Sequence, residues 1–348
     1  MDDRAAYNAI RHATAVYARG ARFVEVSGLQ RAELLSWALA KSTEYAQPGT
    51  SIDTLALGDD GSPVDLVLAV FDEDRTILVS DVTDGVLDQL PALAEERGLT
   101  DVAVTPLEGW CAVAVEGPSC WTIVEDLVED DLASMTLMER RPAKSPLGAP
   151  GILGRIGTTA EFGYLWLGEA PLEETLQSFV DRAEARDPAS GLITPAALQR
   201  AQLEVNNPVF PDMFEGLTLR EAGLEWLAGA GRDDEFRGQP DDVDTPRERG
   251  LVAVHAYGHE IPAKGTPVEA GGVKVGEIFV AAPQVGQPDG FALALLDVPF
   301  DVPSLDLEAG GVPLKTVSRP AVDPQSWTET IGSRAIGSAT YQADLMAS

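Results

Sequence analysis

The chain has 348 residues, of which 45% are hydrophobic and 23% charged, so it has room for about two or three folded domains, and its composition excludes a wholly disordered or fibrous protein. With 25 Lys and Arg against 56 Asp and Glu, the formal net charge is −31, which repels phosphate backbones and anionic lipid. We therefore expect a folded protein that binds neither nucleic acid nor a membrane surface.

The first third of the chain predicts helices and strands in irregular alternation. The spacing of apolar residues indicates helices over 4–19, 29–41 and 84–97 and strands over 22–28, 51–57, 64–71, 75–80, 102–107 and 112–115. The turn-forming run at 58–63, which contains an Asp-Gly pair, predicts a β-hairpin between two of these strands.

The rest of the chain predicts mixed helices and strands before an acidic stretch and mainly strands after it. The elements expected before it are a helix start over 118–126, a strand pair over 152–156 and 164–167 and an amphipathic helix over 171–185. This mixture favours an α+β fold over a doubly wound sheet, which needs strict repetition of strand and helix. The stretch 231–249 predicts a solvated linker with a domain boundary near 240–248. Short strands separated by Gly/Pro turns then predict a small β-barrel or sandwich, over 251–256, 273–280, 291–296 and 311–317.

Few residues offer a catalytic relay or a metal site. His255 and His259 are four apart but lie in a predicted strand and turn, where that spacing does not put two imidazoles on one face. Cys111 and Cys120 lack a CxxC spacing and a nearby His, so we expect buried free thiols and no bound metal. No glycine-rich phosphate loop of known spacing occurs.

Nothing in the sequence predicts a membrane anchor or an export signal. No apolar run approaches the roughly 20 residues that span a bilayer, and the N-terminus lacks a basic region followed by an apolar stretch. We therefore expect a cytoplasmic protein.

One carboxylate lies among apolar neighbours. Glu204 falls within Ala201–Val205, where burial would require a hydrogen-bonding partner. A ligand with an amidine-like or guanidine-like edge would provide two donors, whereas a position on a helix surface or at a helix cap would provide water or backbone. The residues alone leave both interpretations open.

Segments spread along the chain share a family's motifs in the same order. They are Phe23–Gly28 before a helix, the hairpin Gly58–Val67, the turn Ala114–Pro118, Arg155–Tyr164, Leu203-Glu204, Glu221–Trp226, Ile261–Gly265, Val275–Glu277 and Gly290–Ala294. Together they resemble the glycine-cleavage T-protein (aminomethyltransferase) superfamily, whose relatives include folate-binding iron–sulfur maturation proteins and folate-dependent demethylases. The resemblance covers about residues 7 to 320.

The resemblance implies an α+β fold with three domains around a central channel. Its domains are a first α+β domain from 1–50 plus about 115–240, an inserted α+β lobe from about 51–115 with part of 150–200, a C-terminal β-barrel from 245–325 and a tail over 326–348. The polar tail is expected to form an irregular strap or a loose end.

The resemblance also implies tetrahydrofolate as cofactor. Glu204 matches the family's glutamate that holds the pterin edge, a role suited to a carboxylate because it accepts two hydrogen bonds at once. Glu161, Arg249 and Thr158 match further cofactor-binding positions, with Thr158 standing where the family has a tyrosine. Arg155 and Arg247 are additional candidates for the anionic glutamate tail; a surface ion pair is the alternative for each arginine.

The substrate side departs from the family. The family's aspartate pair appears here as Val64-Asp65, which leaves Asp65 as the candidate catalytic residue, for general-acid or electrostatic assistance at the folate nitrogens. Adjacent strand residues face opposite sides, so Asp65 does not simply replace an aspartate lost at position 64. The "EAG" after the pterin glutamate has become Glu204-Val205-Asn206.

These features predict a folate-dependent transferase that moves a methyl or methylene unit to or from a small molecule other than the glycine-cleavage intermediate. A non-catalytic folate-binding protein of iron–sulfur maturation is one alternative, although that branch's cysteine motif has no counterpart between Leu219 and Gly238. A relative that has lost folate and binds another small molecule is the other. A protein partner or a homo-oligomer stays open.

Overall fold

The computed structural model describes residues 1–83, 85–214, 216–229, 232, 234–239 and 247–327, which fall into two compact units. The first unit comprises Met1–Arg19, Gly109–Ala201 and the segment from Val322, and the second comprises Gly20–Glu108 and Gln202–Ala321. Most of the predicted boundary near 240–248 and all of the tail beyond residue 327 lie outside the described residues. Among the helices of the described part, none has the length and apolar character needed to cross a membrane.

The first unit is built on a six-stranded sheet in the order β11-β1-β7-β10-β9-β8. Its neighbouring strands are antiparallel except β11, which is parallel to β1. The strands are β1 (Ala15–Arg19), β7 (Trp110–Glu116), β8 (Arg140–Lys144), β9 (Pro150–Gly154), β10 (Gly163–Glu169) and β11 (Gly191–Leu192). The α-helices are α1 (Asp3–His12), α4 (Leu172–Arg186) and most of α5 (Pro195–Glu204), and the short 3-10 turns are η2 (Cys120–Ile123), η3 (Leu132–Ser134) and η5 (Gln325–Trp327).

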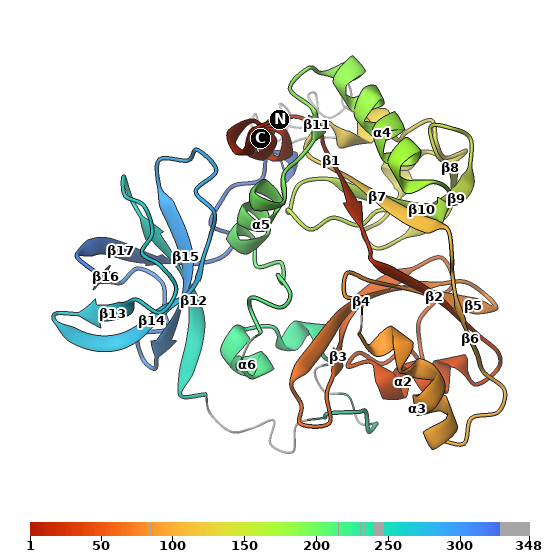
Figure 1. Cartoon of the computed structure of the whole chain (residues 1–348), viewed down its shortest axis with the longest axis horizontal. Helices are drawn as coiled ribbons and strands as arrows, with labels where there is room; N and C mark the ends of the chain where they lie inside the picture. Colours follow the sequence, from red (N-terminus) through yellow and green to blue (C-terminus); the bar gives the residue numbers. More distant parts are fainter. Residues whose placement is uncertain (84, 215, 230–231, 233, 240–246, 328–348) are drawn as a thin grey trace, which may run out of the picture. The chain divides into compact units, whose positions relative to one another are not determined.

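Helix α4 covers one face of this sheet, as Figure 1 shows. Its apolar stripe, which includes Phe179 and Ala183, packs on the buried side chains of β7 and β10. The rings of Phe179 and Trp166 lie 6.4 Å apart. Both cysteines are free and buried, as predicted, and Cys111 and Cys120 belong to this core.

The second unit contains a five-stranded antiparallel sheet in the order β3-β4-β5-β2-β6. Its strands are β2 (Arg22–Ser27), β3 (Ser51–Leu57), β4 (Pro63–Phe71), β5 (Arg75–Ser80) and β6 (Ala103–Pro106). The helices are α2 (Arg31–Ala38), α3 (Leu90–Glu96) and α6 (Leu219–Ala222), with 3-10 turns η1 (Val86–Asp88) and η4 (Glu225–Leu227). Apolar residues of α2 and α3 pack against this sheet to form one core cluster.

The same unit ends in a closed six-stranded barrel. Its order is β12-β15-β14-β13-β16-β17, and all pairs in it are antiparallel. The strands are β12 (Arg249–Ala256), β13 (Pro267–Ala270), β14 (Val273–Ala281), β15 (Gly290–Asp297), β16 (Asp306–Ala309) and β17 (Val312–Val317). Alternate residues of these strands fill the barrel interior.

A second apolar cluster joins the sheet, the segment after α5 and the outer face of the barrel. It includes Leu55 on β3, Leu203 at the end of α5, Phe214, and Phe291 on β15. Because Leu203 is fully buried here, the residue that follows it is held at a fixed position in the unit.

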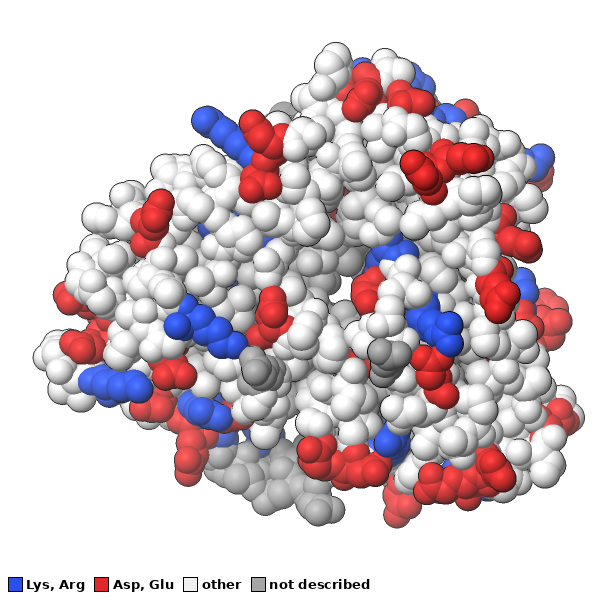
Figure 2. All heavy atoms as spheres, viewed as in Figure 1, with Lys and Arg blue, Asp and Glu red and all other residues white. Residues whose placement is uncertain are grey.

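The expected α+β fold with a C-terminal barrel is confirmed, while two predicted helices differ from the structure. The helix start expected over 118–126 is only the 3-10 turn η2. The helix expected over 4–19 ends at His12, and Ala15–Arg19 forms β1, because pairing with β7 and β11 on both edges outweighs local helical preference. The hairpin β3–β4 forms as predicted. The central channel stays a prediction. Acidic side chains are spread over the face seen in Figure 2, with fewer basic ones among them.

Candidate functional site

Glu204 is the last residue of α5 and only 1% of its surface is exposed. Its backbone carbonyl accepts a hydrogen bond from the amide of Ala321 at 2.7 Å, which fastens the segment after β17 to the helix end. The helix stops because Asn206 adopts a left-handed conformation with φ of 63°, and the amide of Asn207 turns back to the carbonyl of Gln202. Asparagine tolerates this conformation better than most other residues with a Cβ, so the turn can form without a glycine.

Asn206 also brings a polar atom that no described group satisfies. Its side-chain Oδ1 is buried and accepts no hydrogen bond. A buried acceptor without a donor costs about 1 to 3 kcal/mol, so an atom of this kind needs an explanation. The chain at the end of α5 thus carries the buried carboxylate of Glu204 and, two residues later, a second buried acceptor.

Asp65 lies on β4 and is completely buried. Its Oδ1 accepts a hydrogen bond from the Ser80 hydroxyl on β5 at 2.7 Å, whereas Oδ2 has no hydrogen-bond partner among the described residues. Burial raises the pKa of this carboxyl from 3.8 to about 6, and the Ser80 hydroxyl and the nearby backbone amides of Val86 and Leu66 offset part of that rise. A Cβ at Gly85 would overlap Oδ2, so glycine is what lets the chain pass this close.

Thr158 is held in a saturated network around Glu116, which ends β7 and is 1% exposed. Oε1 of Glu116 accepts hydrogen bonds from the Tyr17 hydroxyl at 2.5 Å and from the Thr158 amide and hydroxyl at 3.0 Å each. Oε2 accepts from the Thr159 amide at 3.0 Å and from its hydroxyl at 2.5 Å. Burial, and next the Glu116 charge, raise the pKa of Tyr17 well above its usual value, so this hydroxyl stays a donor.

Glu161 is equally enclosed, with a fully buried side chain. It accepts hydrogen bonds from the amides of Gln325 at 3.2 Å and Ser326 at 2.9 Å, and from the Ser326 hydroxyl. Arg11 lies 3.7 Å away and also donates to the carbonyls of Thr159 and Ala201, at 2.7 and 3.1 Å. Glu161 thus ties the turn at 325–327 to α1.

The three predicted arginines each have partners in the chain. Arg249, at the start of β12, contacts Glu221 at 2.5 Å with 43% of its side chain exposed. Arg247 pairs with Asp301 at 2.7 Å. Arg155 donates to the carbonyl of Met135 at 2.5 Å. For Arg249 and Arg247 the contacts seen are the ion pairs that were the alternative interpretation, whereas Arg155 contacts a backbone carbonyl.

The structure therefore sorts the predicted residues into two groups. Thr158 and Glu161 share the loop between β9 and β10, where their contacts build the fold of the first unit. Asp65 on β4 and Glu204 at the end of α5 form the other group of buried carboxylates. Oδ2 of Asp65 is itself without a hydrogen bond, and near Glu204 it is Oδ1 of Asn206 that lacks one. Sequence reasoning missed Glu116, whose donors are up to 99 residues away along the chain. It also missed Asn206, although the loss of the family's glycine marked that position.

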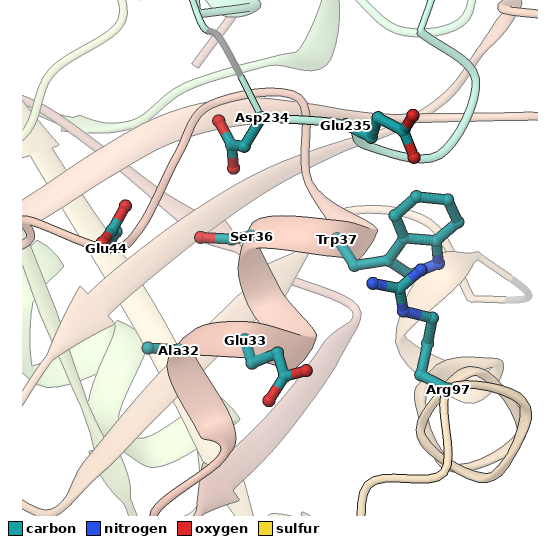
Figure 3. A pocket seen from close by; sticks show the side chains of 8 residues that line it. All are labelled: Ala32, Glu33, Ser36, Trp37, Glu44, Arg97, Asp234 and Glu235. Atoms are coloured by element: carbon teal, nitrogen blue, oxygen red, sulfur yellow. The ribbon is translucent and has the colours of Figure 1, made fainter.

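The second unit also has a surface pocket of about 480 Å³ that holds none of the predicted residues. Figure 3 shows the Arg97 side chain reaching the ring of Trp37 on α2, with a guanidinium-to-centroid distance of 4.2 Å. The pocket is lined by Ala32, Glu33, Ser36, Trp37, Glu44, Arg97, Asp234 and Glu235. In the described part of the chain, no three His, Cys, Asp or Glu residues are grouped so that they could hold a metal ion.

The known proteins to which this chain is similar share the name aminomethyltransferase. The chain is 27% identical to an aminomethyltransferase of Streptomyces avermitilis over 316 residues, which cover 85% of this chain and 83% of that protein. It is 26% identical to the Streptomyces coelicolor aminomethyltransferase, with the same coverage of 85% and 83%. The crystal structure of the glycine cleavage system aminomethyltransferase T from Bartonella henselae superposes with a TM-score of 0.78 at 17% identity, over 92% of this chain and 90% of that one. No protein-family model matches the sequence.

Proposed function

Because the chain belongs to the glycine-cleavage T-protein (aminomethyltransferase) and folate-binding superfamily, a family of folate-dependent one-carbon transfer, we propose that it binds tetrahydrofolate. We further propose that it transfers a methyl or methylene unit to or from a small molecule other than the glycine-cleavage intermediate. The substrate side supports the second part, because the family's aspartate pair is reduced to Val64-Asp65 and its tyrosine is replaced by Thr158.

The observation that carries the proposal is the pair of acceptors at the end of α5. A pterin edge presents donors, namely the 2-amino group and N3–H. The buried carboxylate of Glu204 and the unsatisfied Oδ1 of Asn206 are acceptors, so the residues present fit the group. A carboxylate away from water binds such an edge strongly because each hydrogen bond is charge-assisted. In this assignment Glu204 and Asn206 hold and orient the ring.

Asp65 is the candidate for proton transfer. When bound, tetrahydrofolate supplies the nitrogen atoms that carry the one-carbon unit. A carboxyl group with a pKa of about 6 exists as acid and conjugate base near neutral pH, as a group that both gives and accepts a proton requires. Ser80 holds Oδ1, and the unpaired Oδ2 is the atom available for the proton.

Isothermal titration with tetrahydrofolate under anaerobic conditions tests the binding assignment. Glu204→Gln should weaken binding about 10- to 100-fold, because it removes charge-assisted hydrogen bonds. Asn206→Gly, which keeps the left-handed turn but deletes Oδ1, should weaken it by a smaller factor of about 5. Lys274→Gln, on an exposed part of barrel strand β14, is the charge-changing control and should bind as the wild type does. The proposal fails if the wild type does not bind, or if all four proteins bind equally.

A further inference from the structure

Arg319 is a cation that the described chain leaves without a counterion. It follows β17 and lies two residues before Ala321, whose amide is bonded to the carbonyl of Glu204. Its Nη1 is buried and has no hydrogen-bond partner, while the residue as a whole is only partly buried. Burial alone lowers the pKa of this guanidinium to about 10, so it stays charged at neutral pH.

This situation is unusual in so acidic a chain. Carboxylates outnumber Lys and Arg by 56 to 25, so a counterion is easy to supply. Other arginines of the second unit take one, as in the pairs Arg22–Asp88, Arg75–Glu25, Arg237–Asp59, Arg247–Asp301 and Arg249–Glu221. A partly dehydrated charge without a partner is destabilising, and no described residue compensates that of Arg319, which an anionic ligand would do.

The position of Arg319 relates it to the same helix end. The Ala321–Glu204 hydrogen bond fixes the segment after β17 against α5, and two residues of chain span at most about 7 Å. Arg319 precedes the donor of this hydrogen bond, Ala321, by two residues, and Asn206 follows its acceptor, Glu204, by two residues. One contributes a buried donor without an acceptor and the other a buried acceptor without a donor. A ligand that satisfies both carries donors on one part and an anion on another.

We propose that Arg319 is an anion-binding residue of the ligand site at the end of α5 and takes a carboxylate carried by the folate or by its one-carbon partner. The guanidinium fork binds a carboxylate bidentately, and partial exposure gives the anion access. The identity of the ligand rests on the proposed function, whereas the anion site itself rests only on the buried Nη1 of Arg319 that makes no hydrogen bond.

Calorimetry with three probes separates the two sources of the carboxylate. They are tetrahydrofolate, 6-methyltetrahydropterin, which has the ring but no carboxylate, and acetate added to the pterin-bound protein. If the folate supplies the anion, Arg319→Gln weakens tetrahydrofolate binding about tenfold or more and leaves 6-methyltetrahydropterin unchanged. If the partner supplies it, tetrahydrofolate binding is unchanged and acetate binding is lost. Unchanged binding of all three probes overturns the proposal.

Failure of the proposed function gives a different pattern. If the wild type binds neither tetrahydrofolate nor the pterin, acetate titrated into the ligand-free protein decides whether Arg319 binds anions. Loss of acetate binding in Arg319→Gln then supports the anion site without folate, and no acetate binding by the wild type overturns it. Arg319→Lys keeps the charge but not the fork, so it should bind with intermediate affinity.

Thermal unfolding of the ligand-free protein gives a readout that a structural role would not produce. Removing an uncompensated, partly buried charge should stabilise the chain, so we expect Arg319→Met to raise Tm by about 2 to 4 °C while it weakens ligand binding. A lower Tm with unchanged ligand affinity would instead assign Arg319 a structural role and overturn the proposal.

Discussion

Glu116 in the first unit and Glu204 in the second are equally buried, each with 1% of its surface exposed, but their surroundings differ. Both oxygens of Glu116 accept hydrogen bonds from the backbone and hydroxyls of Thr158 and Thr159, and Oε1 also accepts one from Tyr17. Two residues after Glu204, Asn206 has a buried acceptor that receives no hydrogen bond. Arg319, two residues before the Ala321 amide that donates to the Glu204 carbonyl, has a buried donor that makes none.

The two regions differ in whether the chain itself satisfies their buried polar groups. Around Glu116 and Glu161 the chain supplies them, so these carboxylates stabilise the fold and have little capacity left for a ligand. Near Glu204, by contrast, Oδ1 of Asn206 and Nη1 of Arg319 are left without a hydrogen bond, which costs stability in the free protein and suits a bound molecule. Burial of a carboxylate alone therefore does not identify a binding site.

The largest expected effect is on stability and comes from removing Glu161, a carboxylate whose hydrogen-bonding partners the chain itself supplies. Glu161→Ala leaves the charge of Arg11 buried and releases the turn at 325–327, so the free energy of unfolding should fall by about 3 to 5 kcal/mol. Denaturant unfolding measures it, with the exposed Glu169→Ala on β10 as the control, expected within about 0.5 kcal/mol of the wild type. A small stability change together with lost tetrahydrofolate binding would place Glu161 in the ligand site.

A second effect, of opposite sign, concerns Asp65. Its folded-state pKa of about 6 lies above the ordinary value of 3.8, so its contribution to stability is complete below about pH 4 and is lost as the pH rises through 6. At pH 7 the ionised group costs on the order of 3 kcal/mol relative to the protonated one. The stability of Asp65→Asn minus that of the wild type should therefore increase by up to this amount between pH 4 and pH 7.

Unfolding curves at pH 4, 5, 6 and 7 measure this difference. Glu73→Gln, an exposed carboxylate on the turn between β4 and β5, is the control and should differ from the wild type by less than about 0.5 kcal/mol at each pH. A difference between Asp65→Asn and the wild type that does not change with pH would contradict the raised pKa. Lost turnover in a stabilised Asp65→Asn would support the role in proton transfer.

The smallest effect is expected at Arg249. Its pair with Glu221 is 43% exposed on the arginine side, so Arg249→Gln should lower the free energy of unfolding by less than about 1 kcal/mol. We expect tetrahydrofolate affinity to change less than twofold, as judged by calorimetry. A tenfold loss of affinity would return Arg249 to the cofactor-binding set that the resemblance implies.

The sequence predicted the elements whose signals are local. Alternation and turn residues located β2, the β3–β4 hairpin and the longer barrel strands β12, β14, β15 and β17. The four-residue strands β13 and β16 carry too little pattern to detect, and β1 was mistaken for helix because its partners β7 and β11 lie far along the chain.

The site could be predicted only in part, for the same reason. Glu204 was recognisable from its apolar neighbours and its motif. The network that occupies Thr158 joins residues 42 and 141 positions apart, and the contact of Glu161 with Ser326 spans 165, so no local pattern announces them. Unsatisfied atoms such as Oδ1 of Asn206 become visible only when all three-dimensional partners are known.

The most direct test of the central claim compares protein and ligand changes together. Calorimetry would follow wild type and Glu204→Gln, each with tetrahydrofolate and with an analogue in which a methyl group replaces the 2-amino group. If Glu204 accepts from that amino group, the wild type should lose about tenfold or more on the ligand change and Glu204→Gln much less, which leaves a coupling of at least about 1 kcal/mol. Equal losses in both proteins would show that Glu204 does not contact the pterin edge, and the account would be wrong.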